Sequence, residues 1–253
     1  MNDRIEKLAA LLRLSHELGN AQHPLAILGE GNASARLTGG TFLVKASGTT
    51  LGTLREQDVV ECNSAGLLRL LDQNSLADLE VEHALMESRG DAGAKKPSVE
   101  ALFHAWLLTL PDVEFAGHTH APAVTGILCS PRAREFATKR IFPDEVVCCD
   151  VESVFVPYTD PGLRLAQAIR EGTEVFIKTH RRNPRVVLLE NHGLITLGRS
   201  VEAVLAAMLM AEKAATIWLA AAALGGPKFL TPEHTMRIAD RPDEELRRQV
   251  LKM

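Results

Sequence analysis

Three histidines have the residue type and local spacing to form a divalent-metal site. His118 and His120 follow the short apolar run of residues 113–117, which favours a strand. Side chains on a strand alternate between its faces, so this spacing places both imidazoles on one side, whereas a helix would turn them about 200° apart. His192 ends a second strand-like run, residues 185–190. Catalytic zinc commonly takes three protein ligands and leaves one position for water or substrate.

A carboxylate precedes the histidine pair at a place that suits catalysis. Glu100 opens residues 101–108, a segment of helical length, so it lies in a first helical turn with His104 one turn later. Any acid at that position also interacts favourably with the helix dipole, and His192 alone is typical of a loop residue that caps backbone groups. Beside a three-histidine metal site, Glu100 has a sharper use as a general base or a displaceable fourth ligand. For His104 we expect a core or supporting position.

Two turns of small residues offer a place for an anionic group. Residues 29–32 are a glycine-rich turn that enters a strand, and residues 46–50 end the return strand of a hairpin that turns at Gly39 and Gly40. Clustered backbone N–H groups and hydroxyls can hold a phosphate or carboxylate without a P-loop. Neither turn matches the Walker or Rossmann pattern, so no nucleotide is implied. Two ordinary β-turns without a ligand explain the same residues.

The composition is that of a globular protein and argues against several kinds of partner. The 253 residues, 46% hydrophobic and 24% charged, can bury a sizeable core in one or two domains. A net charge of −4 and an aromatic content of 4% give no case for binding nucleic acid. The four cysteines lack Cys-x-x-Cys spacing and no secretory leader is recognised, so we expect a cytoplasmic location. Residues 201–224 are apolar, but Glu202, Glu212 and Lys213 leave runs of about ten residues, and we expect no membrane span.

The alternation of helical and strand-like segments predicts an α/β fold. Helical periodicity and end signals predict helices over residues 3–18, 76–88, 163–171 and 201–224. Apolar runs between turn signals predict strands over residues 41–45, 67–71, 113–117, 146–149, 154–156 and 185–190, the last being the final strand of the chain. Residues 226–253 are expected to form a helical or flexible tail.

Five motifs in this order resemble the class II aldolase/adducin family. They are Gly31-Asn32-Ala33-Ser34-Ala35-Arg36, Lys45-Ala46-Ser47-Gly48, Pro97-Ser98-Val99-Glu100 with His104, His118-Thr119-His120 and Asn191-His192-Gly193. The resemblance covers about residues 5–225, and the family includes L-fuculose-phosphate aldolase and L-ribulose-phosphate 4-epimerase. It implies a single domain over residues 1–253, in which a mainly antiparallel central sheet is flanked by helices in three α/β/α layers.

The resemblance also implies a site and a reaction. His118, His120 and His192 would hold a divalent metal, with zinc expected first and manganese or cobalt as alternatives. Glu100 would move a proton during retro-aldol cleavage of a small sugar phosphate or sugar acid, through a metal-stabilised enediolate. A homotetramer with sites between subunits is implied as well. The residues that would hold the substrate phosphate or its neighbouring oxygens are Asn32, Ser47, Gly48 and Ser98.

The second acid/base is less directly indicated. Fuculose-phosphate aldolase uses a tyrosine shortly after its His-x-His strand, donated by a neighbouring subunit, and the corresponding residues 139–145 contain no tyrosine. Dehydratase members use a glutamate from this region, so Glu145 or Asp144 is the candidate, although both also fit a solvated turn. Aldol cleavage is the central expectation. Epimerase, dehydratase and decarboxylase activities remain alternatives, as does a non-catalytic adducin-like scaffold or binding module, against which the retained Glu100 and histidines count.

Overall fold

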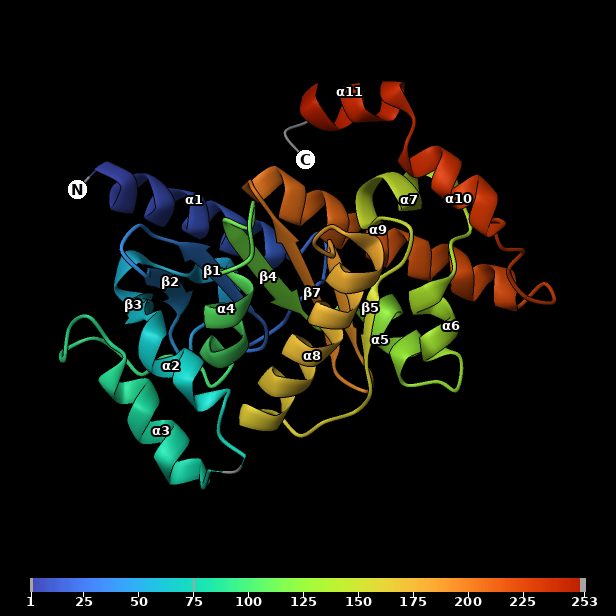
Figure 1. Cartoon of the computed structure of the whole chain (residues 1–253). Helices are drawn as coiled ribbons and strands as arrows, with labels where there is room; N and C mark the ends of the chain where they lie inside the picture. Colours follow the sequence, from blue (N-terminus) through green and yellow to red (C-terminus); the bar gives the residue numbers. More distant parts are fainter. Residues whose placement is uncertain (1, 75, 251–253) are drawn as a thin grey trace.

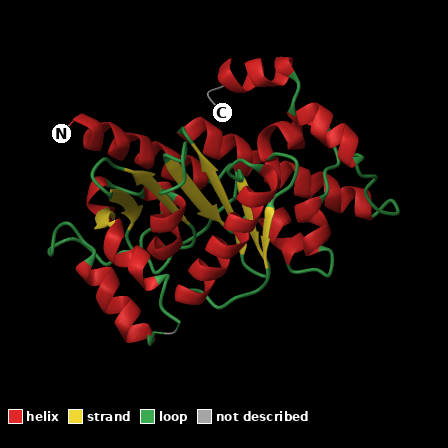
Figure 2. Cartoon of the chain, viewed as in Figure 1, coloured by secondary structure: helices red, strands yellow, loops and turns green. Residues whose placement is uncertain are grey.

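A computed structural model of the chain describes residues 2–74 and 76–250, which form a seven-stranded sheet with helices on both faces (Figures 1 and 2). The strand order is β3-β2-β1-β4-β7-β6-β5, and every neighbouring pair is antiparallel except β5 and β6. The predicted α/β fold with a mainly antiparallel sheet is confirmed. The strands are β1 (Asn32–Arg36), β2 (Thr41–Lys45), β3 (Val59–Asn63), β4 (Phe115–Thr119), β5 (Val154–Val156), β6 (Val186–Leu189) and β7 (Gly193–Gly198).

Two hydrophobic cores, one on each face of the sheet, account for the three layers. The first core is covered by α1 (Asn2–Leu18), α5 (Pro122–Leu128), α6 (Ala133–Thr138), α7 (Pro143–Cys149) and α9 (Val201–Ala222). The second core is covered by α2 (Ser64–Leu70), α3 (Asp78–Glu87), α4 (Ala101–Leu107) and α8 (Leu163–His180). Short 3₁₀ turns at Leu51–Thr53 and Glu56–Asp58 connect β2 to β3.

Alternation along β6 shows how one strand serves both cores. Val186 and Leu188 pack into the first core, while Val187 and Leu189 pack into the second. All four side chains are buried, because helices cover the sheet on both sides. A strand in this position therefore shows an uninterrupted apolar run in the sequence instead of alternating polar residues.

The helix α9 lies along the first core and matches the prediction for residues 201–224 closely. Its length and composition alone make it apolar enough to cross a membrane. Its buried residues recur at intervals of three and four, which is the pattern of an amphipathic helix packed against a core. It contacts the strands β4 and β7 and the helices α1, α5 and α7. The buried residues of α9 are Val201, Val204, Ala207, Met208, Ala211, Ala214, Ala215 and Trp218.

Two predicted strands are wrong, and both are short helices. Residues 146–149 belong to α7, which begins with Pro143 at its first turn and carries Asp144 and Glu145 there. Proline and acids at a first turn are helix-start signals, and they outweigh an apolar run too short to show a period. Residues 67–71 fall in α2 and its C-cap, where the side chain of Asn63 caps the helix by accepting a hydrogen bond from the Ala65 N–H.

The prediction also missed one strand and shortened one helix. The strand β7 follows directly after the residues predicted to be the last strand, and it pairs with both β4 and β6. Three polar residues, Glu190, Asn191 and His192, separate the two strands, and the prediction placed the turn there without a strand after it. The helix α8 continues to His180, well beyond the predicted end at residue 171.

The C-terminal residues form α10 (Pro232–Ala239) and α11 (Pro242–Val250), and residues 251–253 of the predicted tail lie outside the described chain. The helix α10 packs against α7 through a small apolar cluster that includes Val146, Val151 and Ala239. In Figure 1 both helices lie at the end of the chain, away from the central strands. The tail is therefore helical throughout most of its length.

The pairing of β4 with β7 brings two distant segments into close contact. His118 lies opposite Ile195 and Thr119 lies opposite Leu194. At Gly193, where β7 begins, an added Cβ would lie 2.4 Å from the backbone oxygen of Thr119. Only a residue without a side chain lets the two strands meet there.

We expect Gly193→Ala to destabilise the protein by about 1–3 kcal/mol, because the new methyl group must push β7 away from β4. Gly126→Ala is the matched control, since no atom lies within 4 Å of a Cβ at this helical position. That change should be neutral or stabilise the fold by about 0.4–1 kcal/mol. Urea unfolding of both variants measures the difference, and equal stability of the two would show that the strands are not in such close contact.

Candidate metal centre

The strand β4 positions the first two histidines of the candidate site. His118 is the second-last residue of β4, and its imidazole is fully buried. His120 comes just after the strand and is partly exposed. The two side chains point to the same side of the strand, as the sequence predicts, and their Nε2 atoms lie 3.1 Å apart.

The turn between β6 and β7 supplies the third histidine. Asn191 adopts a left-handed backbone conformation with φ of 54°, which asparagine tolerates better than most residues. The N–H of His192 donates a hydrogen bond to the Leu189 oxygen, which closes the turn. Because β7 pairs with β4, this turn places His192 beside the end of β4.

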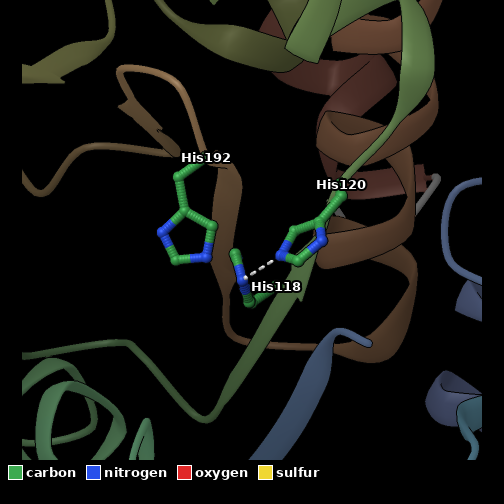
Figure 3. Close-up of side chains that lie close together, drawn as sticks. All are labelled: His118, His120 and His192. Carbon is green, nitrogen blue, oxygen red and sulfur yellow. Dashed lines mark hydrogen bonds between the residues drawn. The ribbon is translucent and has the colours of Figure 1, made fainter. Parts of the chain in front are cut away.

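The three imidazoles converge on one point (Figure 3). One nitrogen from each of His118, His120 and His192 lies within 4.8 Å of the others, and each pair of ring centroids is 5.0 Å apart. Two nitrogens bound to a tetrahedral zinc at ordinary bond lengths are about 3.4 Å apart. The observed 3.1 Å between the Nε2 atoms of His118 and His120 is close to that value. The donor set and its geometry fit a divalent metal.

Hydrogen bonds at the opposite ring nitrogens orient two of these imidazoles. The Nδ1–H of His118 donates to the Leu194 carbonyl oxygen at 2.9 Å. The Nδ1–H of His120 donates to a carboxylate oxygen of Glu30 at 3.0 Å, and the other oxygen of Glu30 accepts from the Ile27 N–H. A hydrogen bond at Nδ1 fixes the tautomer and leaves the Nε2 lone pair free to bind a metal. Sequence reasoning missed Glu30, which lies 90 residues before its partner.

Glu100 lies beside the histidines, at the N-cap of α4. One of its oxygens is 3.2 Å from Nε2 of His118 and 3.7 Å from Nε2 of His192. Figure 3 does not draw this carboxylate, but the distances place it at the open side of the same cluster. It is within reach of a substrate or water held there, and it could also act as a fourth ligand.

Burial and the charges of neighbouring side chains determine the protonation of Glu100, His118 and His192. Burial raises the pKa of Glu100, but the charge of His118 and its hydrogen bond outweigh burial and hold that pKa at about 2. Burial lowers the pKa of His118 as well, but Glu100 reverses the direction and the pKa is raised. Burial, with His118 adding to it, lowers the pKa of His192 to about 4. At neutral pH Glu100 is therefore an ionised carboxylate and His192 a neutral imidazole, which are the forms that metal binding and proton abstraction require.

His104 has the supporting position that the sequence suggested. It is fully buried, its Nδ1 lies 2.7 Å from the hydroxyl oxygen of Ser34, and its ring packs on Phe103. Burial lowers the pKa of His104 to about 3, so it is neutral. It stands behind Glu100 and the metal ligands and is not one of the three converging imidazoles.

The predicted substrate-binding residues lie around the same end of the sheet. Asn32 pairs with His118 across β1 and β4, and its buried Nδ2 has no hydrogen-bond partner among the described residues. The N–H of Ser47 binds the Lys96 oxygen, and the neighbouring Ala46 bridges to Pro97, which brings Ser47 to the segment that carries Ser98. The hydroxyl of Ser98 accepts the Glu100 N–H at 3.3 Å.

Gly48 and Lys45 complete the two small-residue turns. Gly48 has φ of 73°, and a Cβ there would face open space. Lys45 is almost fully buried, and its ammonium donates to the oxygens of Gly29 and Thr49. It therefore joins the two turns that the sequence suggested as an anion cradle. Burial lowers the pKa of Lys45, and the nearby Glu100 acts in the opposite direction.

Glu145 is the predicted site residue that the structure does not bring to the histidines. It lies in the first turn of α7, where its buried carboxylate accepts the Ile141 N–H at 2.8 Å and lies 3.7 Å from Arg140. Burial raises the pKa of Glu145, against the opposing charge of Arg140. Among the described residues, no contact joins Glu145 to Glu100 or to the three histidines.

The family described as Class II Aldolase and Adducin N-terminal domain matches residues 7–219. A solved N-terminal class II aldolase domain from Thermoplasma acidophilum superposes with a TM-score of 0.68 at 23% identity. It covers 84% of this chain and 93% of that one. This likeness shows that the two chains share a fold.

Two curated relatives are similar in sequence. The uncharacterized oxidoreductase YuxG from Bacillus subtilis is 28% identical over 182 residues, which are 69% of this chain but only 24% of that protein. This chain therefore spans about a quarter of the length of YuxG. The 5-methylthioribulose-1-phosphate/5-deoxyribulose-1-phosphate aldolase from Rhodospirillum rubrum is 25% identical over 240 residues, 91% of each chain. With the family match over most of its length, the chain belongs to the class II aldolase and adducin family.

Proposed function

We propose that the protein is a metal-dependent lyase that cleaves a carbon–carbon bond in a small sugar phosphate or sugar acid. The observation that carries this proposal is the convergence of three imidazole nitrogens with the ionised Glu100 beside them. The similarity to an aldolase from Rhodospirillum rubrum over 91% of both chains supports a ketose 1-phosphate as the substrate class. A non-catalytic scaffold has no need for this combination of ligands and base.

The residues of the chain divide the chemistry between them. His118, His120 and His192 would hold a divalent ion, with zinc preferred and manganese or cobalt as alternatives. When bound, the ion supplies a Lewis acid that polarises the carbonyl and hydroxyl oxygens of the substrate. Glu100 accepts and returns the proton that moves when the bond breaks. Cleavage of a ketose 1-phosphate between C3 and C4 yields a three-carbon ketone phosphate and an aldehyde.

The cradle around Lys45 would hold the anionic end of the substrate. We assign this role to Asn32, whose buried Nδ2 has no partner in the described part of the chain, and to Ser47, Gly48 and Ser98. The fixed N–H groups and hydroxyls of these turns suit a phosphate, and a carboxylate would meet the same donors. Epimerisation, dehydration and decarboxylation are the alternative reactions of the family, so the assay must identify products.

Glu145 remains a predicted acid/base, although its burial against Arg140 supports a structural role within one chain. A homotetramer with sites between subunits would allow another residue of a neighbouring copy to complete the site. We also propose a cytoplasmic location. These three assignments rest on the family resemblance and on the composition.

The metal site is tested by elemental analysis of purified protein. We expect about one equivalent of zinc, manganese or cobalt in the wild type and its loss in both His118→Ala and His192→Ala, because each change removes one of three ligands. His83→Ala is the matched control, since that histidine is exposed on α3 and lies outside the cluster. Metal retained in all three variants, or absent from the wild type after incubation with each ion, would contradict the proposal.

The role of Glu100 is tested by Glu100→Gln, which keeps the shape of the side chain but removes the base. We expect kcat to fall about 10²–10⁴-fold while the metal content stays unchanged. The measurement is the release of the aldehyde and the ketone phosphate from 5-deoxyribulose 1-phosphate and 5-methylthioribulose 1-phosphate. Turnover equal to that of the wild type would remove Glu100 from the mechanism, and formation of other products would move the assignment to another reaction of the family.

Glu30 should matter for metal affinity although it would not touch the metal. The Glu30→Gln change removes the negative charge that orients the His120 imidazole and raises its basicity as a ligand. We therefore expect the metal to bind about 10–100-fold more weakly. Glu17→Gln, on the exposed face of α1, removes the same charge elsewhere and should leave affinity unchanged. Competition with a chromogenic chelator gives both dissociation constants. Equal constants would mean that Glu30 does not orient His120.

A further inference from the structure

A pocket lies at the other end of the central strands β4 and β7 from the histidines. Along β4 the histidine end is at Thr119 and the pocket end is at Val113, and along β7 the same ends are Gly193 and Gly198. The cavity has a volume of about 300 Å³. We call it the arginine pocket, because four arginines line it: Arg182, Arg185, Arg199 and Arg248.

The carboxylates of the arginine pocket compensate only part of this charge. Asp150 pairs with Arg182 at 2.9 Å, and Glu245 pairs with Arg248 at 2.9 Å. The third acid, Asp112, is exposed and forms no ion pair among the described residues. Two of the four guanidinium groups therefore pair with a carboxylate, and the other two form no ion pair among the described residues.

The arginines of the pocket that have no carboxylate partner in the described chain are Arg185 and Arg199. Arg185 is half-buried, donates to the Val147 oxygen at 2.8 Å and forms no ion pair within the described chain. Burial lowers the pKa of Arg185, and Arg248 lowers it further, while Asp150 acts in the opposite direction. Arg199 is exposed at the rim. The positive charges of Arg185 and Arg248 repel each other in this partly buried place unless an anion lies between them.

Two further features favour an anion in this pocket. The Nε–H of Arg182 is buried and has no partner among the residues that the structure describes. The first turn of α9, through Ala203, lines the pocket, so the positive end of a 22-residue helix faces it. A buried donor without a partner is costly, and a bound oxygen would satisfy it.

From these contacts we infer that the arginine pocket binds a phosphate group, either inorganic phosphate or the phosphate of a small ester. Guanidinium groups present their N–H donors as a planar fork, which matches the oxygens of a phosphate in pairs. A cavity of this volume admits a small phosphate ester and is at the lower limit for ligand pockets. The site is separate from the histidines and requires neither metal nor substrate.

Binding would also fasten the C-terminal helix. Arg248 belongs to α11, whose Leu246 and Val250 are exposed, so few apolar contacts anchor this helix. Arg248 also donates to the Ala239 oxygen at 3.2 Å. A phosphate held between Arg248 and Arg185 joins α11 to the turn before β6. Backbone amides in both segments then exchange with solvent more slowly.

The test is hydrogen–deuterium exchange of the full chain with inorganic phosphate, compared with chloride at equal ionic strength. We expect slower exchange in α11 and in residues 182–185 with phosphate only. In the double variant Arg199→Ala/Arg248→Ala, phosphate binding measured by calorimetry should weaken by at least about tenfold. Arg237→Ala is the matched control, because this exposed arginine on α10 does not line the pocket.

Three outcomes would overturn the inference. The first is equal protection by chloride, which indicates general screening of charge. The second is protection confined to residues 46–50, which places phosphate in the cradle near the histidines. The third is unchanged binding in the double variant. Because none of these measurements uses the metal or catalysis, failure of the arginine pocket leaves the proposed lyase activity untouched, and the reverse also holds.

Discussion

The antiparallel pairing of β4 and β7 is the constraint on which the candidate site depends. It joins segments that are more than 70 residues apart in the chain, and it sets His118 opposite Ile195 two residues after the start of the strand. The absence of a side chain at Gly193 lets the turn that carries His192 lie against Thr119. The relative positions of the three imidazoles, and the hydrogen bond from His118 to the Leu194 oxygen, depend on this pairing.

A second level of organisation is electrostatic. Glu100 is buried among imidazoles, and the opposing effects of burial and charge leave it ionised next to a His118 whose pKa is raised. A divalent ion at the three imidazoles would compete with a proton for Nε2 of His118, and the carboxylate of Glu100 would stabilise either positive charge. Lys45 adds a positive charge behind the two small-residue turns and fixes them through backbone oxygens. The groups that act on a substrate are thus held by neighbours that are themselves buried.

Local rules were sufficient for much of the fold and for the ligands. The spacing of His118 and His120, the helix start at Glu100 and the hairpin after Arg36 each depend on a few neighbouring residues. Prediction failed for contacts between residues that are distant in the chain. Glu30 reaches His120 across 90 residues, and no local pattern marks it.

Short apolar segments were the other source of error. The apolar run in α7 is too short to show a helical period.

The burial of Glu145, in the same helix, depends on its contact with Arg140. The guanidinium of Arg140 is buried and binds the oxygens of Ala137, Cys149 and Asp150. From the sequence Glu145 was a candidate acid/base with a solvated turn as the alternative, because a sequence does not show which charged groups fold inward together. Tertiary contacts decide such cases.

The central position of β4 and β7 has a consequence for how related chains can differ. The site is attached to strands in the middle of the sheet, whereas β3 and β5 form its edges. Insertions near residues 72–96, between β3 and α4, or replacement of the segment after α9, alter the periphery and leave the ligand-bearing strands in register. The family match ends at residue 219, before α10 and α11 begin. The two terminal helices therefore lie outside the part of the chain that the family match covers, and they can change without moving β4 or β7.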